Sequence, residues 1–251
     1  MPYVITLVSA LTVRELWLNE NDSKKSEKIV LKSAKQAWLE KSSNFGDLMV
    51  LLGAVGSSSN FYKNSTGLTE FCKKLCMRKR AVLEVFKLMR QLEKTVKHGL
   101  PDFELKFPIP GMSADQANLL QQVVISSFGD QIAVKSGKSG SGKNPLVTYQ
   151  AQMVDDDLFI HPSSVFHGKS YASSPDMIVY QEIIESESGR TYMKECMSVS
   201  DLTLIGKLCE SLCTYRVFFL KCRIFEHGYF LVKKPDFESF LGQNKVNKKG
   251  Q

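Results

Sequence analysis

Residues 158–199 decide the fold of this chain, and they read LFIHPSSVFHGKSYASSPDMIVYQEIIESESGRTYMKECMSV. An apolar run ends at His161, and the proline that follows has no backbone donor, so it marks the end or edge of a strand. Beyond a segment rich in Ser, Gly and Pro, residues 177–184 read as a strand with one buried face. A charged turn, residues 185–190, joins it to a second strand, residues 191–199. Short strands and tight turns predict a small β-barrel of a kind that binds nucleic acids.

The sequence before this stretch predicts helices. Residues 2–18 have apolar side chains at helical spacing, and residues 45–56 form a nearly all-apolar helix that should be buried and end at Gly56. Residues 68–98 oppose an apolar stripe to a basic one, which predicts a pair of helices joined near Met77. Helices first and strands later predict the α+β class.

Three further segments lie around these helices. Residues 24–40 predict an amphipathic helix whose basic face is either solvated or in contact with RNA. Residues 113–134 predict another helix, with Ser113 as its N-cap. Residues 135–145 are rich in Gly, Ser and Lys, which predicts a flexible linker to the strands.

That linker contains GKSGSGK, residues 137–143, which satisfies the spacing of a phosphate-binding loop. Asn144 stands where such a loop needs a magnesium-binding Ser or Thr. Pro145 then precedes a strand-like run, whereas the loop requires a helix whose N-terminus meets the phosphate. The acidic residues 155–157 are predicted to lie in a turn and supply no magnesium site. We therefore expect no nucleotide to bind here.

Composition narrows the function further. The chain has 251 residues and a net charge of +7, which favours a polyanionic partner. Its six cysteines lack the knuckles and histidine partners of a zinc site, so we expect reduced thiols. A histidine that fixes its loop by hydrogen bonds is favoured at His161 over a catalytic base, because no nucleophile and base stand at a recognisable spacing. Since no run approaches the roughly 18 apolar residues of a membrane span, we expect a soluble intracellular protein without a membrane partner.

Three segments of the barrel region carry a family resemblance. They are FIHPSSV (residues 159–165), VYQEIIE (residues 179–185) and YMK (residues 192–194), and they closely resemble the OB-fold of the DEAH-box RNA helicases. The resemblance is nearest to the nucleolar DEAH helicase that acts on the small-subunit pre-ribosome. The turn at residues 186–191 is longer than the family's turn and lacks its paired threonines, so we expect an extended loop there.

The helical region resembles the same family. GDLMVLL (residues 46–52), FCKK (residues 71–74) and the residues around Arg80 and Arg90 are similar to the ratchet-like helical bundle that accompanies the OB-fold. The resemblance implies a surface that contacts RNA, and its predicted members are Arg78, Arg80, Arg90, Gln91, His161, Ser163, Ser164, Tyr180 and Lys194. The alternative for Arg90 and Gln91 is that they only hold the bundle to its neighbour.

The resemblance divides the chain into five parts. Residues 1–18 would be a remnant of a winged-helix region, and residues 19–134 the ratchet-like bundle. Residues 135–145 would be the linker, residues 146–242 the OB-fold and residues 243–251 a disordered basic tail.

What the resemblance implies about function is a C-terminal RNA-binding accessory module of a DEAH-box RNA helicase. The expected process is rRNA processing and small-subunit ribosome biogenesis in the nucleus and nucleolus. Expected partners are single-stranded RNA or pre-rRNA, the helicase motor lobes and a pre-ribosomal protein. The sequence contains no RecA-like lobes, which bind ATP and magnesium in the family, so no cofactor and no enzymatic activity are expected of this chain alone. The alternative is a protein-interaction module with incidental RNA contact, which a weak dependence of binding on salt would reveal.

Overall fold

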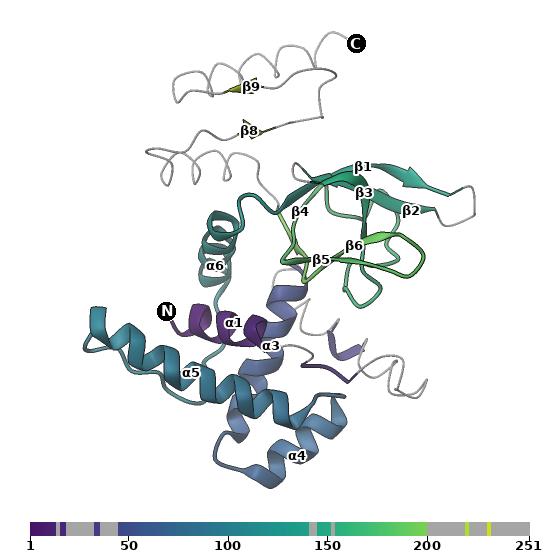
Figure 1. Ribbon diagram of the computed structural model, residues 1–251. Coiled ribbons are helices and arrows are strands. Elements are labelled where there is room, and N and C mark those ends of the chain that lie inside the picture. Colours follow the sequence, from purple (N-terminus) through teal and green to yellow (C-terminus); the bar gives the residue numbers. More distant parts are fainter. Residues whose placement is uncertain are drawn as a thin grey trace. The chain divides into compact units, whose positions relative to one another are not determined.

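The computed structural model describes residues 1–13, 16–18, 33–35, 45–140, 145–151 and 154–199, and the backbone of residues 219–220 and 230–231. The chain forms two compact units, Met1–Gln121 and Gln122–Gln251, and each is considered by itself (Figure 1). Helices dominate the described part of the first unit and strands that of the second, which confirms the α+β class.

The first unit is a helical bundle. Its described elements are α1 (Pro2–Thr12), α3 (Asp47–Ser58), the 3₁₀ turn η1 (Ser59–Phe61), α4 (Ser65–Lys74), α5 (Lys79–Gly99) and the first part of α6 (Ala114–Ser127). Helix α1 packs against both α3 and α5. Helix α3 is buried along most of its length, as its apolar sequence predicts. The amphipathic helix predicted for residues 24–40 lies mostly outside the described residues.

The predicted joint near Met77 is confirmed. Helix α4 ends at Lys74 and α5 begins at Lys79, and the segment between them is held by the stretch that follows α1. The Arg78 N–H donates to the Leu16 carbonyl at 2.9 Å, and the Leu18 N–H donates to the Cys76 carbonyl at 2.9 Å. These bonds satisfy backbone groups that the break between the helices leaves without helical partners.

The end of α3 differs from the prediction. The helix runs through Gly56 to Ser58, because an interior glycine costs only about 1 kcal/mol and tertiary packing outweighs it. The Ser58 and Ser59 hydroxyls donate to the carbonyls of Val55 and Gly56 at 2.7 and 2.5 Å, which satisfies groups in the last turn.

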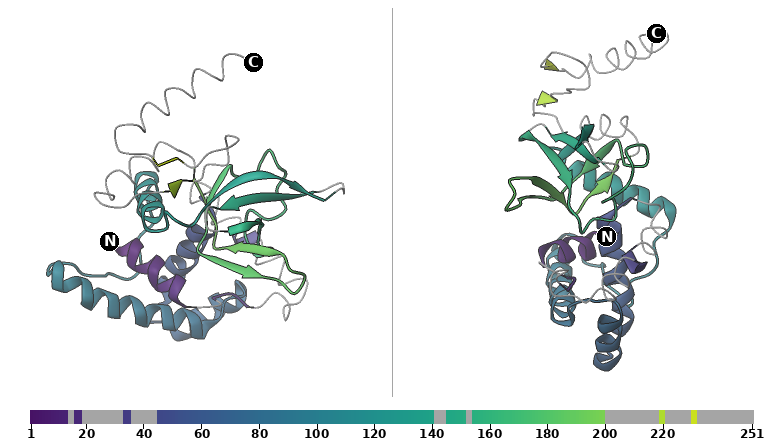
Figure 2. Two further views of the ribbon diagram at one scale, coloured as in Figure 1. Left: turned by 45° about the horizontal axis from the view of Figure 1, so that its top comes forward. Right: turned by 90° about the vertical axis from the view of Figure 1, so that its right-hand side faces the viewer.

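The second unit contains a seven-stranded sheet. Its strands are β1 (Ile132–Ser139), β2 (Leu146–Ala151), β3 (Val154–Ile160), β4 (Met177–Val179), β5 (Glu182–Glu185), β6 (Thr191–Lys194) and β7 (Met197–Ser198), in the order β5-β6-β3-β2-β1-β4-β7. Neighbouring strands are antiparallel except for β3 and β6, which are parallel. Figure 2 shows the strands curving around a common interior.

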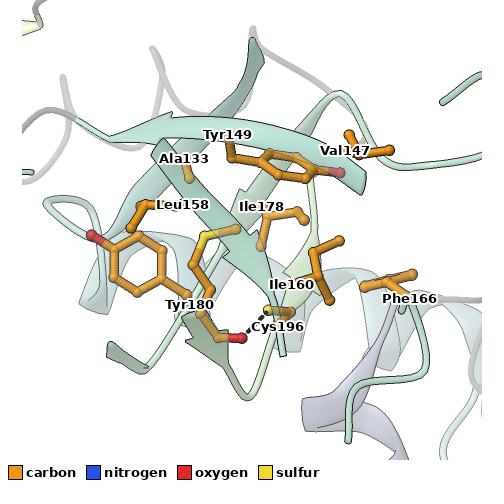
Figure 3. Close-up of a cluster of buried hydrophobic side chains, with 10 residues drawn as sticks. Ala133, Val147, Tyr149, Leu158, Ile160, Phe166, Ile178, Tyr180 and Cys196 are labelled. Carbon is orange, nitrogen blue, oxygen red and sulfur yellow. Dashed lines mark hydrogen bonds between the residues drawn. The ribbon is translucent and has the colours of Figure 1, made fainter. Parts of the chain in front are cut away.

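A single apolar cluster fills that interior (Figure 3). It consists of Ala133, Val147, Tyr149, Leu158, Ile160, Phe166, Ile178, Tyr180, Met193 and Cys196. Its members come from β1, β2, β3, β4 and β6 and from the segments that join them, so the cluster is built by pairing between strands that are distant in sequence.

Three sequence expectations for this unit are corrected. Residues 132–139 form β1, not the end of a helix and a flexible linker, because this strand pairs with β2 on one side and β4 on the other. Residues 155–157 lie in β3 with exposed side chains, not in a turn. The turn after β5 is compact, not an extended loop, since the Ser186 N–H donates to the Arg190 carbonyl at 2.9 Å.

The strand predicted for residues 177–184 is divided into β4 and β5. The Tyr180 N–H donates to the Gln131 carbonyl at 3.1 Å, and the Gln181 N–H donates to the Lys194 carbonyl at 3.2 Å. The chain therefore changes partner at these two residues, from β1 to β6. Strands β8 (Phe219–Leu220) and β9 (Phe230–Leu231) pair antiparallel with each other.

Candidate nucleic-acid interface

Strands β3 and β6 place side chains alternately on the two faces of the sheet. Leu158 and Ile160 of β3 and Met193 of β6 belong to the apolar cluster. Because side chains alternate along a strand, Phe159 and Tyr192 lie on the opposite face. The two residues are direct partners in the parallel register, so this face has adjacent aromatic rings.

A row of aromatic and basic side chains follows this face, and we name it the β3–β6 face. Its members are Phe159, His161, Arg190, Tyr192 and Lys194. The ring centroids of Phe159 and Tyr192 are 6.1 Å apart, and those of His161 and Tyr192 are 5.8 Å apart and perpendicular. The Arg190 guanidinium lies 5.8 Å above the Phe159 ring.

Exposure on the β3–β6 face is graded. Arg190 is exposed, and His161, Tyr192 and Lys194 are half-buried, whereas Phe159 is only 8% exposed. Phe159 therefore packs against Arg190 and Tyr192, and the side chains of these two residues remain accessible to a ligand. An accessible aromatic ring flanked by cations is the usual arrangement for stacking a base and neutralising its phosphate.

His161 closes the turn that follows β3. Its Nδ1 accepts the Ser163 N–H at 3.2 Å and lies 2.7 Å from the Ser163 hydroxyl. An Nδ1 that accepts a backbone N–H places the neutral ring's proton on Nε2. The histidine thus fixes its loop by hydrogen bonds, which is the interpretation that the sequence favours over a catalytic base.

The two neighbouring predicted residues have different surroundings. Ser163 is half-buried beside His161, and it takes part in closing the turn. Ser164 is buried, and its hydroxyl accepts the Phe166 N–H at 3.2 Å. Ser164 therefore shapes the segment after β3 and offers little surface to RNA.

The prediction that Tyr180 contacts RNA is corrected by its position in the structure. It is 3% exposed and belongs to the apolar cluster, where Figure 3 shows it beside Leu158. Burial, followed by the nearby Asp130 charge, raises the pKa of its phenol. Its ring fills the interior of the sheet, so the predicted contact with RNA is withdrawn. The partial alternation of residues 179–184 did not reveal that the chain changes partner at this point.

In the first unit, Arg78, Arg80 and Gln91 are exposed. Arg78 is the N-cap of α5 and Arg80 lies in its first turn, where no acidic residue accompanies them. Other exposed cations of α4 and α5 are Lys73, Lys74, Lys87, Lys94 and Lys97. The basic side chains predicted from the sequence thus do reach the surface of these helices.

Arg90 has a different environment, inside a network of contacts. Its Nη1 donates to Glu93 Oε2 at 2.8 Å and to the Leu105 carbonyl at 2.9 Å. Its guanidinium lies 4.6 Å from the centroid of the Phe107 ring, which stacks on Tyr62 at 4.2 Å. All of these partners lie in the first unit, so Arg90 stabilises the bundle from within, which differs from the predicted alternative of a contact between the bundle and its neighbour.

The Glu93 carboxylate completes this network. Burial alone would raise its pKa, but the hydrogen bonds from the Leu105 N–H, Arg90 and Lys97 outweigh burial and lower the pKa below its ordinary value. The Leu105 N–H donates to Glu93 Oε1 at 2.9 Å. Arg90 and Glu93 therefore clamp both backbone groups of Leu105, and the segment after α5 is tied to that helix.

Within the described residues, no three His, Cys, Asp or Glu side chains are grouped so that they could hold a metal ion. Cys72, Cys76 and Cys196 are buried and are not in disulfides. Among the helices in the described part of the chain, none is long and apolar enough to cross a membrane.

Comparisons with known families place both units. Residues 120–208 match the oligonucleotide/oligosaccharide-binding (OB)-fold model, and residues 1–51 match the ratchet-like helicase associated domain (HA2). The human probable ATP-dependent RNA helicase DHX37 is 34% identical over 86% of this chain. The chain belongs with the C-terminal region of the DEAH-box RNA helicases.

Other relatives of this helicase region agree. The probable ATP-dependent RNA helicase kurz of Drosophila melanogaster is 31% identical over 75% of the chain, and the putative ATP-dependent RNA helicase rha-2 of Caenorhabditis elegans is 27% identical over 86%. The chain spans 19%, 16% and 19% of the lengths of the human, fly and worm relatives. Their names describe proteins several times longer than the matched region.

The matches also bear on the predicted parts of the helicase region. The ratchet-like match begins at residue 1, so it includes residues 1–18, which the sequence analysis assigned to a winged-helix remnant. The OB-fold match begins at residue 120, before the predicted start at residue 146. Strand β1 lies inside this match, which agrees with its place in the sheet.

Sequence reasoning missed Phe159, Arg190 and Tyr192 as members of the β3–β6 face. Phe159 and Tyr192 stand within the segments that resemble the helicase family, but nothing in one sequence states that β3 and β6 are parallel neighbours. Arg190 stands in the turn where the family pattern is lost. An aromatic residue two positions from a basic residue in each strand was the available signal.

Proposed function

We propose that this chain is an RNA-binding accessory module of a DEAH-box RNA helicase, and that its β3–β6 face holds single-stranded RNA. The observation that carries the proposal is the row formed by Arg190, Phe159, Tyr192 and His161 on one face of the OB-fold sheet. Tyr192 would stack on a base, while Arg190 and Lys194 would neutralise phosphates.

Binding by this face would depend little on RNA sequence. Aromatic stacking accepts any base because every base has a π-face, and an arginine or lysine recognises a phosphate whatever base is attached. The exposed Arg78, Arg80 and Gln91 of the first unit are proposed as additional contacts along the strand. Binding that does not depend on base sequence is what a helicase needs if it moves along RNAs of many different sequences.

The helicase context extends the proposal. The relatives are named ATP-dependent RNA helicases, so we propose that the module works together with motor lobes that bind ATP and magnesium. The family resemblance nearest the nucleolar member supports a role in rRNA processing and small-subunit ribosome biogenesis, in the nucleus and nucleolus. Pre-rRNA and a pre-ribosomal protein are the proposed partners there.

The test is a fluorescence-anisotropy titration of the chain with short single-stranded RNAs of unrelated sequence at several salt concentrations. We expect the affinity to fall steeply with salt because bound phosphates release counterions. Tyr192→Ala should weaken binding by about 1–3 kcal/mol on every sequence. Arg190→Gln should weaken binding and reduce the salt slope by about 1.

Ser188→Ala is the matched control, since Ser188 is exposed in the same hairpin turn but lies outside the β3–β6 face. It should leave both the affinity and the salt slope unchanged. Equal affinities for wild type, Tyr192→Ala and Arg190→Gln would remove this face from the proposal. A folded chain that binds no RNA at low salt would instead favour the protein-interaction module.

A further inference from the structure

Strand β1 contains a bulge that places two lysines on the same face. Lys135 pairs with Tyr149, and Lys138 pairs with Val147, and both of these partners belong to the apolar cluster. In a regular strand, residues three apart would lie on opposite faces. The register shift between Lys135 and Gly137 accommodates one extra residue, so both lysines follow the inner face.

The Lys135 ammonium is buried and has several partners. Its side chain is 10% exposed, and its Nζ donates to the carbonyls of Tyr171 and Ser174 at 3.1 and 3.0 Å. The same Nζ is 2.5 Å from Asp176 Oδ1 and 4.7 Å from the centroid of the Tyr171 ring. An ammonium has three N–H donors, and these three oxygens account for them.

Lys138 offers a contrast on the same strand. Its Nζ lies 4.9 Å from the centroid of the same Tyr171 ring, but the residue is exposed. A cation–ring contact made by such an exposed cation contributes little, because water screens it. Lys135 differs because it is buried and bonds to two backbone carbonyls.

The bonded carbonyls belong to the segment that joins β3 to β4, residues 161–176, which we name the roof segment. Phe166 inserts from this segment into the apolar cluster. Near its end, the Pro175 carbonyl accepts the Tyr149 hydroxyl at 3.0 Å, and the Asp176 carbonyl accepts the Lys135 N–H at 2.9 Å. Side chains of Lys135 and Tyr149, together with the Lys135 backbone N–H, thus fix the part of the roof segment that lies before β4.

A lysine at this position is physically unusual. Burial of an ammonium costs several kcal/mol unless charges and hydrogen bonds compensate. An apolar side chain could fill the space, but it could not satisfy the Tyr171 and Ser174 carbonyls. Both carbonyls accept a hydrogen bond from this one ammonium, in a segment that contains no helix or strand.

We propose that Lys135 is a positioning residue for the β3–β6 face. The roof segment begins with His161, whose ring contacts Tyr192 and whose Nδ1 bonds to Ser163, and it ends at the groups that Lys135 and Tyr149 hold. By fixing that end, Lys135 limits the motion of the His161 turn without touching the ligand. This inference rests on the proposed function, because its readout is RNA affinity.

The test compares Lys135→Met, Tyr149→Phe and the control Lys138→Met in the full chain. Hydrogen exchange is followed at the Ser173 and Ser174 amides, which both donate to the Ser170 carbonyl. We expect exchange about tenfold faster in Lys135→Met and Tyr149→Phe, and unchanged in Lys138→Met. RNA affinity should fall by about threefold to tenfold in the first two variants, with the salt slope of wild type.

The salt slope separates positioning from direct contact, since deletion of a phosphate contact would lower it by about 1. Faster exchange with wild-type affinity would overturn the positioning role, as would a lowered slope in Lys135→Met. If Lys135→Met does not fold, Tyr149→Phe provides the same comparison. Wild type without salt-dependent RNA binding would refute the proposed function, and unchanged exchange in Lys135→Met would separately refute the anchoring of the roof segment.

Discussion

At the residue scale, Arg90 shows that a charged side chain predicted to contact a ligand can instead bind groups within its own unit. The family pattern makes it a candidate for RNA contact, together with Arg80 two turns and more earlier on α5. In the folded chain its guanidinium bonds to Glu93 and Leu105 and covers Phe107, while Arg80 is exposed. Two arginines of one helix therefore have different environments, because residues 100–110 pack against α5 at Arg90.

Replacement of Arg90 by Met should destabilise the chain rather than abolish RNA binding. The change removes the donor to the Leu105 carbonyl and one partner of the buried Glu93. Because Arg90 itself is 38% exposed, we expect a loss of about 1–2 kcal/mol in the free energy of unfolding, measured by urea denaturation.

Lys87→Met is the control for that substitution, since Lys87 is exposed on the same helix. It should change the free energy of unfolding by less than about 0.5 kcal/mol. Equal stabilities of Arg90→Met and wild type, combined with weaker RNA binding by the folded variant, would restore Arg90 as a direct contact.

At the scale of elements, α6 shows a terminus that the sequence predicts correctly. Ser113 precedes the helix, and its Oγ accepts the Gln116 N–H at 3.3 Å. Gln116 Oε1 in turn accepts the Ser113 N–H at 3.0 Å. This reciprocal pair is a capping box, which local sequence alone specifies. The predicted N-cap is confirmed.

Ser113→Ala should therefore lower the free energy of unfolding by about 1 kcal/mol. Ser126→Ala is a suitable comparison, because Ser126 is in the same helix and its hydroxyl only donates to the Val123 carbonyl at 2.8 Å. We expect a change below about 0.5 kcal/mol for Ser126→Ala in the same denaturation experiment. A smaller effect for Ser113→Ala than for Ser126→Ala would show that the capping box is unimportant.

Strand β1 shows the limit of local sequence. Residues 132–139 read IAVKSGKS, and the Lys, Ser and Gly residues of the second half are typical of a linker. Pairing with β2 and β4 supplies backbone hydrogen bonds on both sides, and these outweigh the low strand propensity. Residues 155–157 continue β3 in spite of three consecutive aspartates, between Val154 and Leu158, which both pair with β2.

On the scale of the whole molecule, the helical bundle and the OB-fold together form the region that the helicase relatives share. The GKSGSGK segment, which has the spacing of a phosphate-binding loop, lies partly outside the described residues. We propose that the catalytic step belongs to the motor lobes of the helicase, while this region contributes affinity for RNA.

The chain alone should accordingly hydrolyse no ATP, with or without RNA. A phosphate-release assay on the purified chain should give the rate of the buffer control, and Lys143→Ala should give the same result. Turnover that RNA stimulates and that Lys143→Ala abolishes would revive the phosphate-binding loop that the sequence argues against.

The sequence by itself determined the α+β class, the α4–α5 joint, the α6 cap and the resemblance to the DEAH-box helicases. These features depend on local spacing, on capping residues and on short motifs, which a single chain displays directly. The exposed Arg78, Arg80 and Gln91 were also accessible in this way, because helical periodicity separates a polar face from an apolar one.

Only the tertiary structure decided which residues share the β3–β6 face, that Tyr180 is buried and that Arg90 and Lys135 bind backbone carbonyls. Each of these facts depends on contacts between residues far apart in the chain, such as the parallel pairing of Phe159 with Tyr192. A one-residue change of register would move a side chain to the other face of the sheet, and no local pattern fixes the register of strands that are distant in sequence.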